Sequence, residues 1–433
     1  MALKSVKIPH RKNTKDAKPI RMDAPQLLYF SAVQHIGAPA KPTVKIGDEV
    51  KVGTLIFEAA GAISSPVYSS VSGKVKKIED MLQSNGTYQQ CIVIENDGQM
   101  TLDESIKAPE INDYESFVSA VFASGVVGLG GAGFPTAVKL DVKDVSRIEQ
   151  IIINGAECEP YITSDTRTML DRADDIAFGV ELLKKYLGAK NIIFGIENNK
   201  SECIAEMKKI AGVEVKALPS IYPQGAEKVL VYNTTGKVIE EGKLPIDAGV
   251  IVINCTTLAA VASYVKTGLP LVEKCVTVDG SAVNEPKNVI VPIGTPVSAV
   301  FEFCGGFKEQ PAKVIYGGPM MGVSIADMNV PVTKQTNALI ALNEKDATPK
   351  KTTSCIRCGR CTNTCPFGLA PVAFAKALEQ NDMEAMKHLH ANLCMECGCC
   401  AYVCPAGIPL VQQNKMAKAA LAAYLKKEKE EKK

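Results

Sequence analysis

Residues 128–139 read GLGGAGFPTAVK, and the interpretation of this glycine-rich stretch decides the fold of the chain around it. Gly128, Gly130 and Gly133 form a G-x-G-x-x-G pattern, which marks a dinucleotide-binding Rossmann turn only where a strand precedes it. The residues before it, ESFVSAVFASGVV, place apolar side chains at 117, 118, 121, 122 and 126, which is a helical spacing. The sequence pattern therefore argues against the strand–turn–helix context of a Rossmann unit.

The same stretch has the composition of an anion-binding loop. Phe134-Pro135-Thr136 is expected to open a second helix, with proline at its first position. Glycine amides at a helix N-terminus, with Lys139 one turn inside, can bind a phosphate group. The alternative is a flexible turn between helices, which would not explain four glycines, a proline and a lysine together.

Polar side chains also follow the next predicted strand, in the motif INGAECEP. Asn154, Glu157 and Glu159 lie just past the carboxyl end of that strand, where open α/β sheets bind their ligands. Taken alone, this signal is weak, because exposed glutamates are usually only solvated.

The composition excludes several classes of protein. Nearly half of the 433 residues are apolar, and the net charge of +2 gives no reason to expect nucleic acid as a partner. The first twenty residues lack the apolar segment of a secretory signal, and no stretch approaches the ~18 apolar residues of a membrane span. Fifteen cysteines without a secretory signal indicate a reducing compartment rather than a disulfide framework.

Nine of the cysteines lie between residues 355 and 404, in two runs, CIRCGRCTNTCP and CMECGCCAYVCP. Both match the bacterial-ferredoxin pattern C-x2-C-x2-C-x3-C-P, in which the fourth cysteine ligates the other cluster. The predicted ligands of one [4Fe–4S] cluster are Cys355, Cys358, Cys361 and Cys404. Those of the second are Cys365, Cys394, Cys397 and Cys400. Structural zinc is the alternative, and two complete four-cysteine runs argue against it.

Other residues near the two cysteine runs are not expected to be cluster ligands. The spacing rule selects Cys400 over its neighbour Cys399, which we expect to be an additional thiol beside the cluster. The segment between the runs is predicted to be helical, with His388 and His390 as surface or packing residues on that helix. The six cysteines outside the runs are expected to be small buried hydrophobic residues.

Hydrophobic patterning divides the chain into modules, and the predicted fold class is multidomain α/β and β. Residues 1–108 alternate apolar and polar positions between frequent turns, which indicates a β module. Residues 109–267 alternate helices with buried strands, which indicates an α/β layer fold. Residues 268–325 return to short strands, residues 326–353 are predicted to be a linker, and residues 354–433 form a helical two-cluster domain with a charged tail. Within the α/β part, strands are predicted at 150–154, 191–196 and 250–254, and helices at 114–126, 166–187 and 224–232.

The glycine stretch and the following NGAECEP together resemble the flavin- and NADH-binding signature of the flavoprotein subunit of respiratory complex I, G-R-G-G-A-G-F-P-T-G-x-K followed by N-A-D-E-S-E-P. YPQGAEK and NCTTL resemble two further motifs of that family, Y-x-x-G-E-E and N-x-x-T-L. The resemblance implies an FMN held by Gly128, Gly130, Gly131, Gly133, Lys139, Asn154, Glu157, Tyr222, Gly225, Asn254 and Thr257. It also implies NAD(H) near Phe134, Glu159 and Glu227. Leu129, Ala156 and Ala226 depart from the family pattern, which leaves the phosphate cradle intact and makes the nucleotide contacts less certain.

Over nearly its full length the chain resembles the RnfC family, one of the subunit families of the Rnf electron-transport complex. The motifs QHIGAPAKPTVKIGDEV, VPIGTP, YGGPMMG and the paired cysteine runs occur in that family's order. The resemblance implies a peripheral subunit on the cytoplasmic face of the cell membrane, facing NAD(H), within an ion-pumping ferredoxin:NAD+ oxidoreductase. Its partners would be the other subunits of the complex, including membrane and ferredoxin-facing ones, while this chain would have no transmembrane segment of its own.

The two β modules also resemble known ones. The first resembles the hammerhead of biotinyl and lipoyl domains, but residues 58–63 contain no lysine, so we predict an unmodified packing or docking module. Residues 268–325 resemble a β-grasp ligand-binding module, whose ligand the sequence does not name.

These features predict a redox enzyme subunit. NADH gives up two electrons as a hydride, whereas a cubane accepts one electron at a time. A flavin between them can accept the hydride and pass its electrons on singly. We expect no catalytic side chain, with Glu157 and Glu159 as binding and orienting groups. The alternatives are a microcompartment-type cobalamin reductase and a non-enzymatic iron–sulfur relay with a vestigial flavin site.

Overall fold

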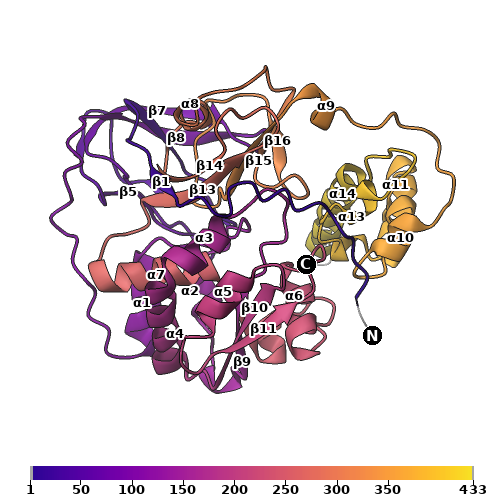
Figure 1. Cartoon of the computed structure of the whole chain (residues 1–433), viewed down its shortest axis with the longest axis horizontal. Helices are drawn as coiled ribbons and strands as arrows, with labels where there is room; N and C mark the ends of the chain where they lie inside the picture. The colour runs from indigo at the N-terminus through magenta and orange to yellow at the C-terminus, as the bar shows by residue number, and fades with distance from the viewer. Residues whose placement is uncertain (1–2, 432–433) are drawn as a thin grey trace.

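Four β-sheets, the helices that pack around them and a separate helical lobe make up residues 3–431, the part of the chain that the computed structural model describes (Figure 1). The helical lobe, drawn in yellow and orange, lies beside the rest of the molecule. A thin N-terminal segment, drawn in indigo, runs from the neighbourhood of this lobe across the body of the protein.

The central α/β domain contains a parallel four-stranded sheet in the order β11-β10-β9-β12. Its strands are β9 (Gln150–Gly155), β10 (Asn191–Glu197), β11 (Glu214–Leu218) and β12 (Val250–Asn254). The three strands predicted from buried apolar runs are thereby confirmed. Because all four strands are parallel, their carboxyl ends lie along one edge of the sheet.

Helices cover both faces of this sheet, which explains why its central strands are apolar throughout. Ile151 and Ile153 pack on the side of α1 (Tyr114–Ala123), α4 (Ala173–Leu187) and α7 (Cys255–Thr267). Ile152, between them in sequence, packs on the opposite side against α6 (Glu227–Thr235). Two shorter helices, α3 (Ser164–Asp171) and α5 (Ser201–Met207), complete this region.

The predicted helices exist, but their boundaries differ from the predicted ones. The helix expected at 166–187 is two helices, α3 and α4, because Arg172 leaves the helical conformation at φ −130°. Its guanidinium donates to the Asp175 carboxylate and the Ala259 carbonyl oxygen, which stabilises the break. The first helix ends at Ala123, three residues early, where Gly125 adopts φ +66°.

The N-terminal β module consists of two small antiparallel sheets, in the orders β2-β8-β7-β4 and β3-β5-β6. Its strands are β2 (Leu27–Ser31), β3 (Lys41–Pro42), β4 (Glu49–Val50), β5 (Leu55–Glu58), β6 (Val67–Tyr68), β7 (Gly73–Leu82) and β8 (Tyr88–Asn96). Its apolar residues, such as Phe30 and Ile56, share one continuous core with helix α1 and the central sheet. The module is therefore packed firmly against the α/β domain.

A six-stranded mixed sheet, in the order β1-β14-β13-β17-β15-β16, forms the third region. Five of its strands are β13 (Glu273–Asp279), β14 (Lys287–Pro292), β15 (Lys313–Tyr316), β16 (Val323–Ile325) and β17 (Ala338–Leu342), and the helix α8 (Val297–Phe303) packs beside them. The structure differs here from the linker predicted at 326–353. Strand β17 is completely buried between β13 and β15, because its sequence ALIAL is apolar at every position. The short helix α9 (Glu344–Ala347) follows it.

The sixth strand of this sheet comes from the start of the chain. Strand β1 (Ile20–Arg21) pairs in parallel with β14, and before it Val6 forms an antiparallel bridge with Tyr222. Residues 3–21 thus lie along the α/β domain and the six-stranded sheet rather than within the first β module (Figure 1).

The C-terminal lobe is helical, as predicted. It contains α10 (Arg360–Thr364), α11 (Pro371–Glu379), α12 (Met383–His388), α13 (Cys399–Tyr402) and α14 (Leu410–Glu431). The segment between the cysteine runs forms two helices rather than one, separated by Asn381 at φ +53°. His390 lies beyond the second helix at φ +58°, with Nδ1 3.1 Å from the Glu241 carboxylate. The expectation that His390 belongs to the helix is therefore wrong.

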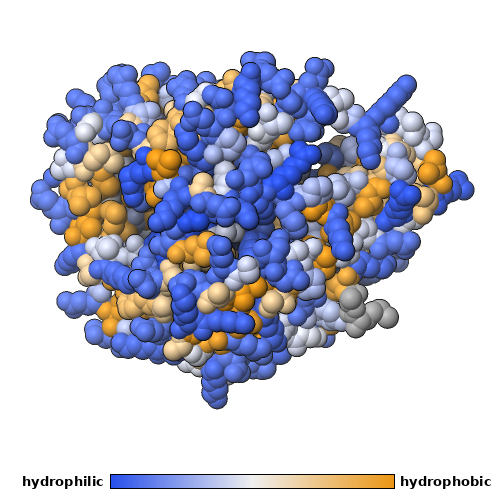
Figure 2. Space-filling model, viewed as in Figure 1, coloured by the Kyte–Doolittle hydropathy of each residue, from blue (hydrophilic) through white to orange (hydrophobic). Residues whose placement is uncertain are grey.

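The surface seen in Figure 2 is mainly hydrophilic, with apolar residues scattered among charged ones. No helix among residues 3–431 is long and apolar enough to cross a membrane.

Candidate functional site

The glycine stretch forms a tight loop that closes on itself. The Gly128 amide donates to the Phe134 carbonyl oxygen at 2.8 Å, and the Gly133 amide donates to the Gly128 carbonyl oxygen at 3.0 Å. Gly131 and Gly133 adopt φ values of +110° and +66°, which favour glycine. The helix after the loop, α2 (Thr136–Leu140), is only five residues long, and Pro135 precedes it as the N-cap. The expectation of proline at the first helical position is wrong, and so short a helix contributes little dipole.

Two side chains hold the loop from opposite sides. The Leu129 amide donates to the Thr257 hydroxyl at 2.9 Å, and the Leu129 carbonyl oxygen accepts from the Lys274 ammonium at 2.7 Å. The Leu129 side chain is buried in the core of the α/β domain, so this departure from the family pattern serves packing. Lys274 belongs to strand β13, and the six-stranded sheet therefore helps to fix the loop.

Asparagines at the carboxyl ends of two strands meet this loop. Asn154 donates to the Gly225 carbonyl oxygen at 2.9 Å, and Asn254 accepts from the Thr257 amide at 3.1 Å as the N-cap of α7. A Cβ atom on Gly130 would lie 3.0 Å from Nδ2 of Asn254. The structure thus brings the glycine loop, Asn154, Gly225, Asn254 and Thr257 together at the edge of the sheet where open α/β folds bind their ligands.

Lys139 and Glu227 form a pair at this edge. The Lys139 ammonium lies 3.1 Å from the Glu227 carboxylate and donates to the Val252 carbonyl oxygen at 3.0 Å. Both side chains are partly exposed. A bound anion would compete with Glu227 for the lysine.

Glu157 has a structural partner in helix α3. Its carboxylate accepts from the Asp165 amide and the Thr166 hydroxyl, both at 2.6 Å, at the beginning of that helix. The side chain is almost fully buried, and Glu157 adopts φ +47°. These contacts give the carboxylate a capping role that the sequence did not suggest.

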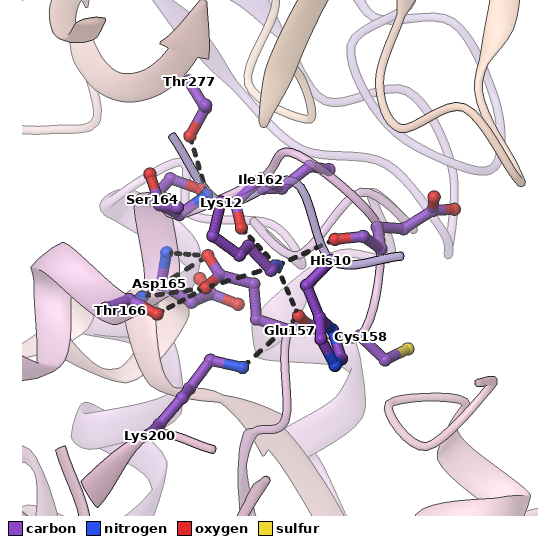
Figure 3. Close-up of polar contacts among 12 residues, drawn as sticks. His10, Lys12, Glu157, Cys158, Ile162, Ser164, Asp165, Thr166, Lys200 and Thr277 are labelled. Atoms are coloured by element: carbon purple, nitrogen blue, oxygen red, sulfur yellow. Dashed lines mark hydrogen bonds and ion pairs between the residues drawn. The ribbon is translucent and has the colours of Figure 1, made fainter. Parts of the chain in front are cut away.

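Lys12, from the N-terminal segment, holds the loop that follows β9 (Figure 3). Its ammonium donates to the carbonyl oxygens of Glu157 and Glu159, each at 2.8 Å, and to that of Ile162. Lys200 donates to the Ala156 carbonyl oxygen at 2.7 Å from the other side. Burial lowers the pKa of Lys12 to about 8, in spite of the nearby Glu157 carboxylate.

Sequence reasoning missed Lys12, because it lies in the strongly basic stretch HRKNTK, which reads as a solvated tail. Lys274 was also missed, although it alternates along its strand with the apolar residues Val276 and Val278, which was a signal. Asp165 is a third omission. Burial raises its pKa to about 6, and its carboxylate accepts from Asn254 and Thr256.

Glu159 faces the six-stranded sheet. Its carboxylate accepts from the amides of Met320 and Met321 at 3.0 and 2.8 Å. Burial raises the pKa of Glu159 to about 7, which the two amides partly offset. This residue joins the loop after β9 to the YGGPMMG motif, and Tyr222 lies in the same buried cluster as Met320.

Several buried polar atoms among residues 3–431 lack hydrogen-bond partners, and two of them lie close in sequence to glycines of the site loops. They are Oγ1 of Thr136, directly after the glycine loop, and Nε2 of Gln224, directly before Gly225. Buried polar groups are normally paired, so these two atoms fit a polar ligand bound between the loops. Phe134 is partly exposed at the end of the glycine loop.

The eight predicted cluster ligands fall into the two predicted sets. One cavity is lined by Cys365, Cys394, Cys397 and Cys400, together with Cys399. A second hollow is lined by Cys355, Cys358, Cys361 and Cys404. In each case the fourth cysteine comes from the other run, as two-cluster ferredoxins require. Within residues 3–431 no three His, Cys, Asp or Glu side chains converge tightly enough to hold a single metal ion, whereas a cubane spreads its four thiolates around a larger group.

The two cysteine sets differ in their surroundings. Cys399 approaches the Tyr222 carbonyl oxygen at 3.8 Å, and Cys397 and Cys399 share a buried cluster with Cys158 and Tyr222. In contrast, Cys355 and Cys358 are exposed. The set that includes Cys397 therefore packs against the candidate flavin site, and two cysteines of the other set face solvent.

Comparisons with known families agree with this division of the chain. Residues 121–263 match the Nuo51 FMN-binding domain, and residues 354–408 match the 4Fe-4S dicluster domain. Residues 3–99 match the RnfC barrel sandwich hybrid domain, and residues 275–324 match the SLBB domain. The NAD+-reducing [NiFe]-hydrogenase has a similar fold over 72% of this chain and 63% of its own, with a TM-score of 0.50 and 19% identity in the H2-reduced state.

Relatives similar over most of their length identify the family, and each of them is the C component of an oxidoreductase complex. The chain is 40% identical to that of the proton-translocating ferredoxin:NAD(+) oxidoreductase of Clostridium ljungdahlii, covering 84% of this chain and 81% of the relative. It is 39% identical to that of the Na(+)-translocating enzyme of Acetobacterium woodii, covering 86% of each. It is 40% identical to that of the ion-translocating oxidoreductase of Rhodobacter capsulatus, covering 95% of this chain and 81% of the relative. The chain therefore belongs to the RnfC family of ion-translocating ferredoxin:NAD+ oxidoreductase complexes.

Proposed function

We propose that this chain is the NAD(H)-reacting subunit of a membrane-associated, ion-translocating ferredoxin:NAD+ oxidoreductase. One observation carries the proposal. The domain that matches the FMN-binding family and the lobe that matches the dicluster family are packed together through Tyr222, Met320 and the run at 394–400. A flavin and an iron–sulfur cluster placed in these two parts would be close neighbours.

Bound FMN would supply the conversion between two-electron hydride transfer and single-electron transfer. The residues proposed to hold it are Gly128, Gly130, Gly131, Gly133, Lys139, Asn154, Tyr222, Gly225, Asn254 and Thr257. Glu157 would act on the site indirectly, by capping α3 and shaping the loop after β9. Lys139 would exchange its contact with Glu227 for the FMN phosphate.

NAD(H) is proposed to bind at the same edge, near Phe134, Glu159 and Glu227. Glu227 would be released for a hydroxyl group of the nucleotide when Lys139 turns to the phosphate. Glu159, held by two backbone amides, would position its loop rather than move a proton in hydride transfer.

We also propose an order for the two clusters. The cluster held by Cys365, Cys394, Cys397 and Cys400 would be the nearer one to FMN, because its ligands lie against Tyr222 and Met320. The cluster held by Cys355, Cys358, Cys361 and Cys404 would exchange electrons with the rest of the complex, because its ligand run faces solvent.

The modules around this relay are proposed to serve docking. We assign residues 1–108, apart from the segment 3–21 that lies along the other domains, to an unmodified hammerhead module, and residues 268–325 to a β-grasp module, with β17 and β1 as further strands of the latter. The partners would be the membrane and ferredoxin-facing subunits of the complex, at the cytoplasmic face of the membrane.

Anaerobic reconstitution of the full chain tests the function. We expect released FMN, about eight irons per chain, and bleaching of both flavin and cluster absorbance by NADH. If the protein binds no flavin and NADH reduces nothing, the enzyme proposal is wrong and an iron–sulfur relay scaffold remains. Reduction of cobalamin would instead favour a cobalamin reductase.

A pair of glycine variants locates the FMN site. Gly131→Ala places a Cβ on the glycine loop at φ +110°, whereas Gly47→Ala does the same at φ +97° in open space on the N-terminal β module. Both variants carry the strain of a side chain at positive φ, about 1–3 kcal/mol. Only Gly131→Ala should lose FMN, with the iron content unchanged in both.

A further inference from the structure

The surface around the exposed cysteine run has an unusual distribution of charge. Between Asp346 and Glu379 the chain contains no acidic residue, although the whole molecule is nearly neutral with a net charge of +2. The same stretch contains five basic residues, which we call the basic rim: Lys350, Lys351, Arg357, Arg360 and Lys376. All five are exposed.

The basic rim is not neutralised by carboxylates from the described part of the chain. In the described part of the chain, none of its five side chains lies within 4.0 Å of a carboxylate, whereas Lys418, beside the other cysteine run, pairs with Glu396 at 3.0 Å. Arg357, Arg360 and Lys376 line the same open hollow as the thiols of Cys355 and Cys358. Arg357, Arg360 and Lys376 therefore lie beside the thiols proposed to hold the solvent-facing cluster, and the charge of the rim remains available to a partner.

An exposed apolar residue lines the same hollow. Ile356, between the first two cysteines of the run, is 67% exposed. An apolar centre within a charged, solvated rim is the usual anatomy of a protein–protein interface. Small interfaces of this kind are typical of transient redox encounters.

We propose that the basic rim is the docking surface for the acidic face of a protein electron carrier that exchanges electrons with the exposed cluster. This inference rests on the proposed function, since it requires the cluster. Each encounter would move one electron between the two proteins, so that one is oxidised as the other is reduced, and no bond forms or breaks.

The exposed charges of the basic rim would act mainly on the rate at which the carrier and this protein associate. Complementary potentials steer a charged partner and raise association rate constants from about 10⁵–10⁶ to 10⁸ M⁻¹s⁻¹ or more at low salt. Exposed charges are screened beyond about 8 Å at physiological ionic strength. An acidic carrier should therefore bind and leave rapidly, with strong dependence on salt.

A protein partner suits the surface better than a lipid headgroup. Three of the cations line the same hollow as the thiols of the proposed redox centre, and electron exchange needs a second redox centre within reach of those thiols. An anionic lipid headgroup would be attracted by the charges, but it could not exchange electrons with a cluster held by the exposed cysteines. Membrane binding is therefore the competing outcome that the test must distinguish from binding to a protein.

The test measures binding by the full-length, cluster-loaded chain to an immobilised acidic two-[4Fe–4S] bacterial ferredoxin. The variant Lys351→Glu/Lys376→Glu reverses two rim charges without altering a residue next to a cysteine. The control, Lys190→Glu/Lys208→Glu, reverses two exposed lysines of the α/β domain that also have no ion-pair partner among the described residues. Iron content of all three proteins is checked first.

We expect the rim variant to bind at least about tenfold more weakly than wild type at about 50 mM salt, with a smaller salt dependence. The control should match wild type. Carbodiimide treatment of the complex should join Lys350, Lys351 or Lys376 to carboxylates of the ferredoxin. Equal binding by the rim and control variants would overturn the proposal.

Two further outcomes are informative. Rim-dependent binding to vesicles containing phosphatidylglycerol, without rim-dependent binding to ferredoxin, would assign the surface to lipid and overturn the proposal. Failure of NADH to bleach the wild-type protein would refute the proposed function, while salt-sensitive binding through the rim would still stand as measured.

Discussion

Lys12 is a buried charged residue that holds the backbone of the loop after β9. Its buried ammonium bonds three carbonyl oxygens of the loop after β9, and no exposed lysine could replace it. Removing it leaves buried acceptors unpaired, so Lys12→Met should lower stability by about 2–4 kcal/mol. Urea unfolding at pH 7 measures this. Lys15→Met is the control, because Lys15 is exposed and pairs only with exposed Asp16. Equal stability of the two variants would contradict this role.

Glu159 should make stability depend on pH. Its folded pKa of about 7 lies above its ordinary value of 4.5, so between these values the folded state binds more protons than the unfolded state. The contribution of Glu159 is therefore complete below pH 4.5 and is lost as pH rises to 7. The slope is at most about 1.4 kcal/mol per pH unit.

Glu159→Gln removes this titration and keeps a side-chain oxygen for the amides of Met320 and Met321. Relative to wild type, the variant should gain stability as the pH is raised from about 5 to about 7. Unfolding of both proteins at each pH gives the difference, which cancels the contributions of other carboxyl groups such as Asp165. A difference that does not change with pH would show that Glu159 titrates normally.

The crossed arrangement of the cysteines predicts a specific non-additive result. Cys365 and Cys394 come from different runs but line the same cavity. Each single change to serine should leave about four irons per chain, and the double change should also leave about four, because both damage one cluster. If each run held its own cluster, the double variant would lose both. Iron analysis distinguishes the two, and Cys399→Ala should keep about eight irons.

At the scale of secondary-structure elements, strand β17 turns a stretch expected to be a linker into part of a core. Ile340 is fully buried between β13 and β15. Ile340→Ala should lower the stability of this sheet by about 2–5 kcal/mol, the usual cost of such a truncation. The control Val238→Ala, at a side chain that is 70% exposed, should change the stability of the protein little. A flexible linker would make the two variants equivalent when compared by thermal unfolding.

The elements found from sequence are those whose pattern is local. The buried runs of β9, β10 and β12 and the apolar spacing of α1 are each readable within one segment. The pairing of β1 with β14 and the insertion of Lys12 are not, because both depend on contacts between residues more than about 140 positions apart. The convergence of Asn154, Gly225 and Asn254 followed from the rule for parallel sheets, whereas the burial of Lys274 depends on a different domain.

At the scale of the whole molecule, the docking of the cluster lobe against the α/β domain determines whether electrons can pass. The run at 394–400 meets the YGGPMMG loop at Gly398. A Cβ atom there would lie 2.8 Å from the Met320 carbonyl oxygen. The N-terminal segment strengthens the same junction, since Val6 and Ile8 pack beside Cys397 and Cys399, and the Thr364 hydroxyl donates to the Ser5 carbonyl oxygen.

Gly398→Ala should therefore weaken communication between the two parts while leaving each part intact. Gly359 is the matched control, because it holds the same place in the other cysteine run, at φ +72° against +79°, and its Cβ would meet only Asn363 at 3.8 Å. Both variants carry similar backbone strain, about 1–2 kcal/mol, but only Gly398→Ala pushes against backbone of another domain. In stopped-flow experiments with NADH, flavin bleaching should be equally fast in both, and cluster bleaching should be slower only in Gly398→Ala. Equal cluster bleaching would mean that this contact does not set the distance between flavin and cluster.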